Sequence, residues 1–448
     1  MVARMKINAF DLFLKQKRFD LIFKYLYLKN KSKDIKTQTL LSLIFDMFHR
    51  KDDNIFDFYT DLYVKHIRAF NGFHEENPSD GKPKESKEDF INSFDNLYKN
   101  MSKKGFDKKI SMIPVGENGD IVDGAHRLVC AAFLGLDVDV IRVSRANTFN
   151  YQFFQKNGLD PCFADYATME YVKLNPNAYI VNLQPITPTS FDWPVEQILE
   201  KYGFIYYKKN INVTLNGLIN LKKLSYGSCW EKNSTWIGTP DNGFAGAVNH
   251  AKKSFGNNPL RTYVFVCDDF QKVVAAKSEI RALFDVGNYS VHINDSHEEA
   301  IALAQTYFNK NSLHMINNRS YLYENTKFDD MVDELHKITK YNGIDLDDVC
   351  GSGSTPLDIY GIRNSKDLDF LYCGQKTFDI KTETLANHDS ELIYYPYSKQ
   401  EIILNPKCHF YYRGVKFITL DVLYSMKQNR HEFPKDINDC DLIQKFLQ

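Results

Sequence analysis

The sequence predicts a multi-domain protein that combines α+β and α/β regions. Its 448 residues exceed the usual length of one domain, so roughly two or three domains are expected. Hydrophobic residues form 43% of the chain and aromatic residues 14%, which is enough to fill several cores and excludes a disordered chain. Helical and strand-like periodicities both occur and change along the chain. They divide it into the regions 1–73, 74–185, 186–330 and 331–448.

The region 1–73 is predicted to be helical. Its apolar residues recur near helical spacing, beginning with Phe10 and Phe13, so one face should be buried in a small helical bundle. The polar stretch 75–84 contains two prolines and a glycine, a composition that argues against any regular element. Residues 86–101 then show the pattern of an amphipathic helix.

The run from Ile113 to Gly135 predicts a β-hairpin followed by a glycine turn that opens a helix. Its most informative part is Asp123-Gly124-Ala125-His126-Arg127. His126 and Arg127 are expected in the first helical turn, where backbone N–H groups have no partner inside the helix. Such a turn binds phosphate well, so the region 74–185 is predicted to be an α+β domain with a phosphate or nucleotide site.

This motif resembles the ParB/sulfiredoxin fold, whose members carry Asp-Gly-x-His-Arg or Gly-x-x-Arg at this turn. The resemblance implies that four residues bind nucleotide phosphates: Asp123, Gly124, His126 and Arg127. It also makes Glu75 or Glu76 an acid/base candidate, as in the small-molecule kinases of this fold. No reductase activity is inferred, because His126 stands where sulfiredoxin has its catalytic cysteine. The alternative is a structural ion pair between Asp123 and Arg127 in a domain without a ligand.

The region 186–330 shows alternating strands and helices. The expected elements are strands at 262–267, 289–293 and 313–316, and helices at 274–284 and 298–308. This alternation predicts parallel pairing with right-handed crossovers. Ligands of such units gather at the carboxyl ends of the strands. The candidate acceptor-binding residues there are Lys277, Arg281, His292 and Asp295, although a histidine on an apolar strand is more often a core residue.

The region 331–448 contains the stretch on which the functional prediction depends. Gly351-Ser352-Gly353-Ser354-Thr355 is followed, a dozen residues beyond Ser354, by Asp367-Leu368-Asp369-Phe370. Carboxylates at alternate positions of an apolar run point to the same face of a strand. A Gly-Ser turn can bring backbone N–H groups and a hydroxyl close to phosphate oxygens. Together these features predict a site for a metal ion and a phosphate.

The same spacing resembles the signature of the polymerase-β-type nucleotidyltransferase superfamily. The resemblance implies a mixed sheet with helices, in which Gly353 and Ser354 hold the phosphates of a nucleotide. It further implies that Asp367 and Asp369, together with a third carboxylate, bind Mg²⁺, a hard cation that prefers carboxylate oxygens. Glu401, which opens an apolar run, is the first candidate for the third carboxylate. Asp379 and Glu391 are the alternatives.

The C-terminal pattern resembles the last helices of many substrate-modifying nucleotidyltransferases. The resemblance implies that basic residues there neutralise a leaving pyrophosphate or nucleotide; the candidates are Lys427, Arg430 and Lys435. Surface charges without such a role are the alternative.

These motifs predict a Mg²⁺-dependent transferase. It would move a nucleotidyl or phosphoryl-alcohol group from an ATP- or CTP-derived donor to a hydroxyl of a small molecule or glycan, as in surface polysaccharide biosynthesis. One alternative is an ATP-dependent small-molecule kinase whose chemistry lies in the region 74–185. Another is a nucleotide-sensing module without catalysis.

The net charge limits the binding partners that are expected, and the cysteine pattern indicates the cellular compartment. The net charge of −1 disfavours a broad nucleic-acid footprint, which requires clustered positive charge. The eight cysteines contain no Cys-x-x-Cys pair and no zinc-like spacing, as expected for thiols in a reducing compartment. No signal peptide and no long apolar stretch were found, so a cytoplasmic location without a transmembrane segment is expected.

Overall fold

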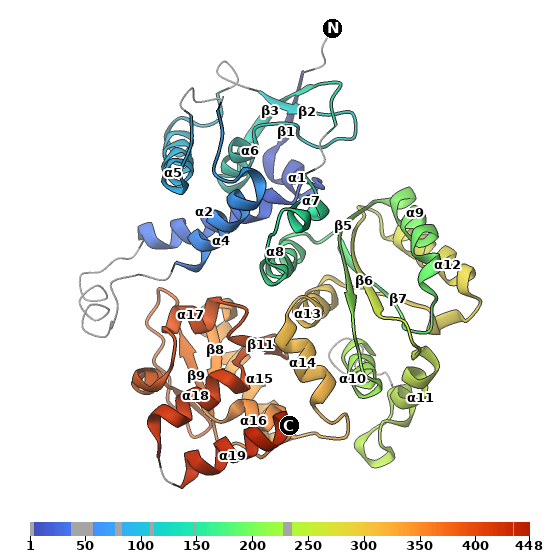
Figure 1. Ribbon diagram of the computed structural model, residues 1–448, viewed down its shortest axis with the longest axis vertical. Helices are drawn as coiled ribbons and strands as arrows, with labels where there is room; N and C mark the ends of the chain where they lie inside the picture. Colours follow the sequence, from blue (N-terminus) through green and yellow to red (C-terminus); the bar gives the residue numbers. More distant parts are fainter. Residues whose placement is uncertain are drawn as a thin grey trace.

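The computed structural model describes residues 4–36, 57–76, 83–107, 112–146, 149–226, 235–432 and 434–448. Within this part of the chain, helices surround three separate sheets of three, four and five strands (Figure 1). The N-terminal sheet lies at the top of that view, the central sheet at the right and the C-terminal sheet at the lower left. The predicted α+β character is therefore confirmed. The three sheets define an N-terminal, a central and a C-terminal region, and the N-terminal sheet combines strands from 1–73 and 74–185.

The first sheet has the strand order β1-β3-β2, in which β1 pairs antiparallel and β2 parallel with β3. Its strands are β1 (Arg4–Asn8), β2 (Ile113–Val115) and β3 (Asp137–Arg142). Its helices are α1 (Ala9–Leu14), α2 (Asp20–Lys36), α4 (Phe58–Asn71), α5 (Lys87–Lys104) and α6 (Ala125–Phe133). The predicted hairpin is present as a bridge between Val115 and Ile121. The described part of 1–73 is helical as predicted, except that it begins with the strand β1.

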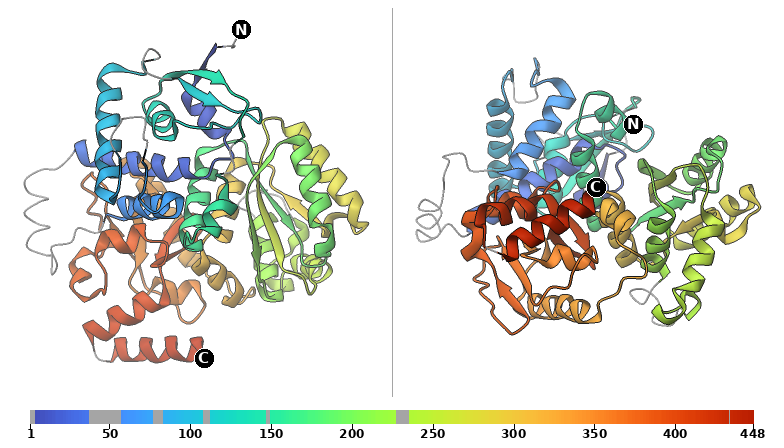
Figure 2. Two further views of the ribbon diagram at one scale, coloured as in Figure 1. Left: turned by 45° about the horizontal axis from the view of Figure 1, so that its top comes forward. Right: turned by 60° about the horizontal axis from the view of Figure 1, so that its bottom comes forward.

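Helix α8 (Pro161–Leu174) contacts the N-terminal, central and C-terminal regions, the last through an ion pair of Lys173 with Asp347 at 2.7 Å. It follows the short helix α7 (Tyr151–Lys156), and its start is fixed because Asp160 caps it and Pro161 occupies its first turn. Ten of its residues, from Phe163 to Val172, are buried. It packs against α2 of the N-terminal region and α13 (His297–Tyr307) of the central region. In the left view of Figure 2 the last two helices, in red, lie at the end of the C-terminal region away from the N-terminal one.

The central sheet is antiparallel throughout, with the order β5-β6-β4-β7. Its strands are β4 (Ala178–Leu183), β5 (Phe204–Ile211), β6 (Leu260–Val266) and β7 (Val291–Ile293). The remaining helices are α9 (Asp192–Tyr202), α10 (Leu215–Tyr226), α11 (Ala245–Ser254), α12 (Phe270–Phe284) and α14 (Lys310–Asn318). The prediction of parallel pairing is wrong, because β4 lies between β6 and β7. Each strand-helix-strand crossover thus spans one intervening strand, as in a split β-α-β unit.

A second correction concerns the strand predicted at 313–316, which lies inside α14. Asn309 caps this helix by accepting a hydrogen bond from the Ser312 backbone N–H at 2.9 Å. A run of four residues is too short to distinguish the period of a helix from that of a strand, and the Asn309 cap stabilises the helix. The two faces of the central sheet differ: α9 and α12 cover one with a separate small core, and α10 and α13 cover the other.

The C-terminal region is a five-stranded mixed sheet with the order β10-β9-β8-β12-β11. Its strands are β8 (Val349–Ser352), β9 (Leu368–Tyr372), β10 (Leu385–Asn387), β11 (His409–Tyr412) and β12 (Val415–Ile418). Its helices are α15 (Thr326–Asn342), α16 (Thr355–Ile359), α17 (Lys399–Leu404), α18 (Leu420–Arg430) and α19 (Lys435–Leu447). β8 and β9 are antiparallel neighbours in the middle of this sheet, so the two halves of the predicted site come from adjacent strands.

Candidate functional site

The Gly-Ser turn and the aspartate pair lie against each other. β8 ends at Ser352, which is directly opposite Asp369 on β9. Gly353 follows with φ of +57°, a conformation that favours glycine. A Cβ atom added there would lie 2.2 Å from Asp369 Oδ2, so only a residue without a side chain fits beside this carboxylate. Thr355 tightens the turn, because its hydroxyl donates to the Ser352 carbonyl at 2.7 Å.

Asp369 lies among several charged groups that affect its pKa. Burial is the largest effect, and it raises the pKa of Asp369 above the usual value. The charges of His388, Lys435 and Arg430 act in the opposite direction, whereas the charge of Asp367 raises the pKa further. Two carboxylates that repel each other in a partly buried site are stabilised by a divalent cation between them. The donor set of Asp367 and Asp369 therefore fits Mg²⁺, which typically takes one or two protein carboxylates and completes its shell with water and phosphate oxygens.

The expected third carboxylate does not join this pair. Glu401 lies on helix α17 and not on a neighbouring strand. Burial raises the pKa of its carboxyl group, and a hydrogen bond with Asn405 partly offsets this effect. Asp379 is exposed, and Glu391 forms an ion pair with Arg430 at 3.3 Å. No three His, Cys, Asp or Glu side chains in the described ranges form a group that could hold a metal ion.

His388 is the neighbour of Asp369 that the sequence did not reveal. β10 pairs with β9 so that Ala386 lies opposite Asp369, and His388 follows the end of β10. Its Nε2 atom lies 4.0 Å from Asp369 Oδ2, and its Nδ1 atom lies 3.4 Å from Ser352 Oγ. Burial lowers the pKa of His388. A histidine after a three-residue strand carries no periodic signal, so only the pairing of β10 with β9 identifies it.

The basic residues of the last two helices have different environments. Lys427 is buried, and its ammonium is held by Asp436 at 3.0 Å and Asp439 at 2.8 Å, which links α18 to α19. Arg430 pairs with the same Asp436 at 2.8 Å. Lys435 is exposed and lowers the pKa of Asp369. The ion pairs of Lys427 therefore favour a structural role for it, whereas Lys435 is an exposed cation whose charge acts on Asp369.

The N-terminal motif forms the expected glycine turn. Gly124 has φ of +81° and precedes α6. A Cβ atom added to it would lie 2.9 Å from Arg127 Nη2, so the guanidinium folds back over the turn. Arg127 also lies 3.6 Å from Asp123, and burial lowers its pKa. Asp123, Gly124 and Arg127 therefore lie together at this turn, as both the predicted phosphate site and the alternative structural ion pair require.

His126 points away from this guanidinium into the helical part of the region. Its Nε2 atom lies 3.0 Å from Tyr63 Oη, and its ring centroid lies 4.6 Å from that of Phe94. Burial lowers its pKa well below the usual value. Glu75 forms an ion pair with Lys84 at 2.9 Å and affects the pKa of Tyr63, whereas Glu76 is exposed.

A buried charge network lies beneath this motif, and the sequence analysis did not find it. Asp20 is fully buried and accepts hydrogen bonds from Arg18 at 2.8 Å and Lys24 at 2.6 Å. Lys24 lies 3.2 Å from His66 Nε2. Arg18 and Lys24 hold the pKa of Asp20 far below its usual range despite burial, which acts in the opposite direction. Asp20 and Lys24 stand among apolar residues of a helical pattern, and this was the feature of the sequence that could have indicated the network.

The four residues predicted to bind the acceptor in the central region do not lie together at one site. Lys277 donates to the Ile293 carbonyl at 2.9 Å and lies 3.3 Å from Asp295. Arg281 lies one turn further along α12, and its Nε atom has no hydrogen-bond partner among the described residues. His292 alternates with Val291 and Ile293, which pack toward α12, so its side chain faces the opposite side of the sheet.

No family model, curated protein or solved structure matches the chain, so its class is inferred from the fold and the site. No helix in the described ranges has the length and apolar character needed to cross a membrane.

Proposed function

We propose that the protein is a Mg²⁺-dependent transferase that moves a nucleotidyl or phosphoryl-alcohol group from a nucleotide donor to a hydroxyl. The observation that carries this proposal is the close approach of Gly353, in the turn after β8, to Asp369 on the adjacent strand β9. The polymerase-β-type nucleotidyltransferases, which the motif resembles, require this juxtaposition of a phosphate-binding turn with a metal-binding pair. A small-molecule or glycan acceptor is favoured over nucleic acid by the net charge of −1.

In this mechanism the Gly353-Ser354 turn binds the donor phosphates, and Asp367 and Asp369 hold the metal. These two carboxylates would hold Mg²⁺, which would supply positive charge to offset the negative charge that develops during transfer. The positive charge of Lys435 lowers the pKa of Asp369, and a cation near this site would favour binding of a polyphosphate. The raised pKa of Asp369 means that metal binding competes with protonation of this carboxylate, so donor binding should weaken as the pH falls.

A thermal-shift panel tests the proposal. Wild type is mixed with Mg²⁺ and each of ATP, GTP, CTP, UTP and their diphosphate-alcohol or sugar conjugates. At least one donor should raise the melting temperature by several degrees, since a ligand that binds only the native state stabilises it. The shift should disappear in Asp367→Asn/Asp369→Asn and persist in Asp330→Asn, an exposed carboxylate on α15. A shift that is unchanged in the double variant would refute the proposal.

A second candidate is an ATP-dependent small-molecule kinase at the Gly124 turn. It is favoured by the position of Arg127 over this turn, with Glu75 as the acid/base group in the same region. In the same panel, an ATP shift that is lost in Arg127→Ala but kept in the double aspartate variant would support the kinase. Binding at either turn without any product from a broad set of acceptors would support a nucleotide sensor.

A further inference from the structure

An open cleft lies where helices α7 and α8 meet strand β5 at the end of the central sheet (Figure 1). It encloses about 340 Å³, a volume in the range of small-molecule sites, which often lie between domains. Its walls come from α7, the first two turns of α8, and residues 207–210 of β5. None of its residues belongs to the Gly124 turn, the Gly353 turn or the aspartate pair, so the cleft is separate from the sites described above.

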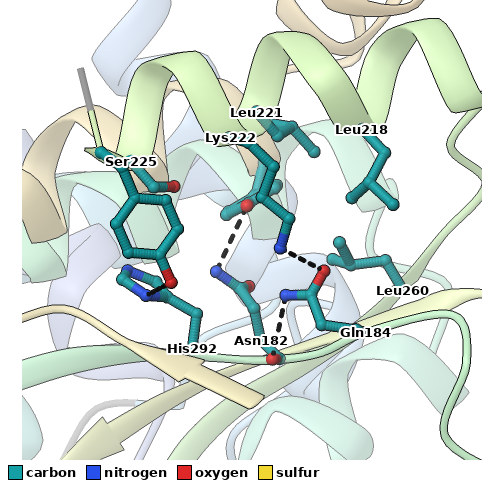
Figure 3. A pocket seen from close by; sticks show the side chains of 10 residues that line it. Asn182, Gln184, Leu218, Leu221, Lys222, Ser225, Leu260 and His292 are labelled. Atoms are coloured by element: carbon teal, nitrogen blue, oxygen red, sulfur yellow. Dashed lines mark hydrogen bonds between the residues drawn. The ribbon is translucent and has the colours of Figure 1, made fainter. Parts of the chain in front are cut away.

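A smaller cavity between α10 and the central sheet has no room for a ligand of this size. Its volume of about 10 Å³ is that of a single water molecule. Figure 3 shows that polar groups of its lining already bond one another. Lys222 donates to Gln184 at 2.9 Å, and Asn182 donates to the Tyr307 hydroxyl at 3.2 Å. These side chains hold α10 and α13 to the sheet.

The open cleft follows the free edge of β5. Side chains of successive strand residues point to opposite faces, so a cleft that touches the four residues 207–210 lies beside the strand and not over one face. β5 is the last strand of its sheet and pairs with β6 alone. Among the described residues, no hydrogen bond outside this pairing uses the backbone of 204–211. The outward N–H and C=O groups of β5 are therefore available to a ligand.

The charged side chains of the cleft are already paired. Lys209 donates to one oxygen of the buried Asp165 at 2.5 Å, and the Tyr207 hydroxyl donates to the other at 2.9 Å. Lys208 bonds Glu196 at 2.7 Å. An anionic ligand would have to take a lysine from its carboxylate, and a cationic ligand would have to displace a lysine. The cleft therefore favours a ligand without charge.

The groups that remain for a ligand are amides and an aromatic ring. The exposed side chains of Gln152, Gln155 and Asn210 line opposite walls, and each amide has N–H donors and an acceptor oxygen. The half-buried Tyr151 ring packs edge-on against Tyr207 at a centroid distance of 5.1 Å, so it is held in place before a ligand arrives. A sugar matches these groups, because its hydroxyls both donate and accept and its C–H faces pack on aromatic rings.

We propose that this cleft binds one uncharged saccharide unit. The amides and the free edge of β5 would bond its hydroxyl groups, and Tyr151 would pack against one face of its ring. Asp165 is occupied by Lys209 and Tyr207, so the sugar is bound without chemical change. This binding needs neither the aspartate pair nor a metal ion, and it is independent of the proposed transferase.

Saturation-transfer difference NMR tests this inference in the absence of nucleotide and Mg²⁺. The full-length protein is mixed in turn with D-glucose, D-galactose, D-mannose and N-acetyl-D-glucosamine. A single sugar should bind with a Kd on the order of 1 mM, so each is used at about ten times this concentration. At least one sugar should receive saturation from wild type. Its signal should fall at least about fivefold in Gln152→Ala/Asn210→Ala, which removes one amide from each wall.

Two control variants separate this cleft from other effects. Gln271→Ala/Asn257→Ala removes an exposed glutamine and an exposed asparagine of the central region that lie outside the cleft, so it should keep the sugar signal. The double aspartate variant of the transferase site should keep it as well. Loss of the signal in that variant would place the sugar at the transferase site and overturn the proposal.

Three other outcomes would overturn the proposal. One is the lack of a signal from all four sugars, and another is a signal that persists in Gln152→Ala/Asn210→Ala. The third is displacement of the sugar by inorganic phosphate at equal concentration, because both lysines of the cleft are expected to be engaged by carboxylates. A peptide of alternating threonine and valine that binds more strongly than every sugar, and not to the double variant, would instead assign the cleft to strand pairing.

Discussion

Gly353→Ala should abolish the stabilisation of the protein by a nucleotide donor and Mg²⁺. The new Cβ would lie 2.2 Å from Asp369 Oδ2, so the carboxylate must move away from the turn with which it forms the site. The backbone at φ of +57° also becomes strained, at a cost of about 1–2 kcal/mol. The measurement is the donor-induced shift in melting temperature, compared with that of wild type.

Gly287→Ala is the matched control for this substitution. Gly287 has φ of +56°, but an added Cβ meets nothing within 4 Å, so it carries the same backbone strain without a clash. Both variants should lose similar stability from strain, and only Gly353→Ala should lose the donor-induced shift. If both variants respond to the donor as wild type does, the contact between the turn and Asp369 has no part in binding.

Asp20→Asn should have the largest effect on stability of the substitutions considered. Asp20 is fully buried and pairs with Arg18 and Lys24, so its loss leaves two cations without their carboxylate. Removing one partner of such a buried pair costs about 3–5 kcal/mol. The free energy of unfolding in urea measures this effect. The control is Asp61→Asn, whose pair with Lys65 is about 40% exposed and should contribute less than about 1 kcal/mol.

The same network determines how stability depends on pH. Since its folded pKa is far below the unfolded value of about 3.9, Asp20 binds protons more readily in the unfolded chain. Its contribution is therefore complete above about pH 4 to 5 and is lost as the pH falls through the folded pKa. Between pH 6 and 2, wild type should lose more stability than Asp20→Asn. Parallel pH profiles would show that Asp20 is not held as an ionised carboxylate.

The local elements of the C-terminal region could be predicted from the sequence. Asp367 and Asp369 flank and enter an apolar run that becomes β9, and Gly353 occupies the turn that needs a left-handed conformation. The position of the third candidate could not be predicted. The apolar residues after Glu401 form a six-residue helix, which a short run of this kind does not distinguish from a strand.

Strand pairing was the main feature that the sequence did not determine. The strands β6 and β7 were expected, but the position of β4 between them depends on pairings across roughly 80 to 110 residues of sequence. The pairing of β10 with β9 places His388 beside Asp369. The position of β7 in the central sheet directs His292 toward Lys222 and not toward Lys277. Side-chain periodicity reports on the local element, whereas these sites depend on the order of strands in the sheet.

Binding of Mn²⁺ tests the metal site most directly, because Mn²⁺ takes the same carboxylate and phosphate oxygens as Mg²⁺ and is visible by electron paramagnetic resonance. The titration is run with the donor that gives the largest thermal shift. Wild type and Asp330→Asn should bind Mn²⁺ with donor present, and Asp367→Asn/Asp369→Asn should not. Equal binding of Mn²⁺ by wild type and the double variant would contradict the assignment of these two aspartates as the metal ligands.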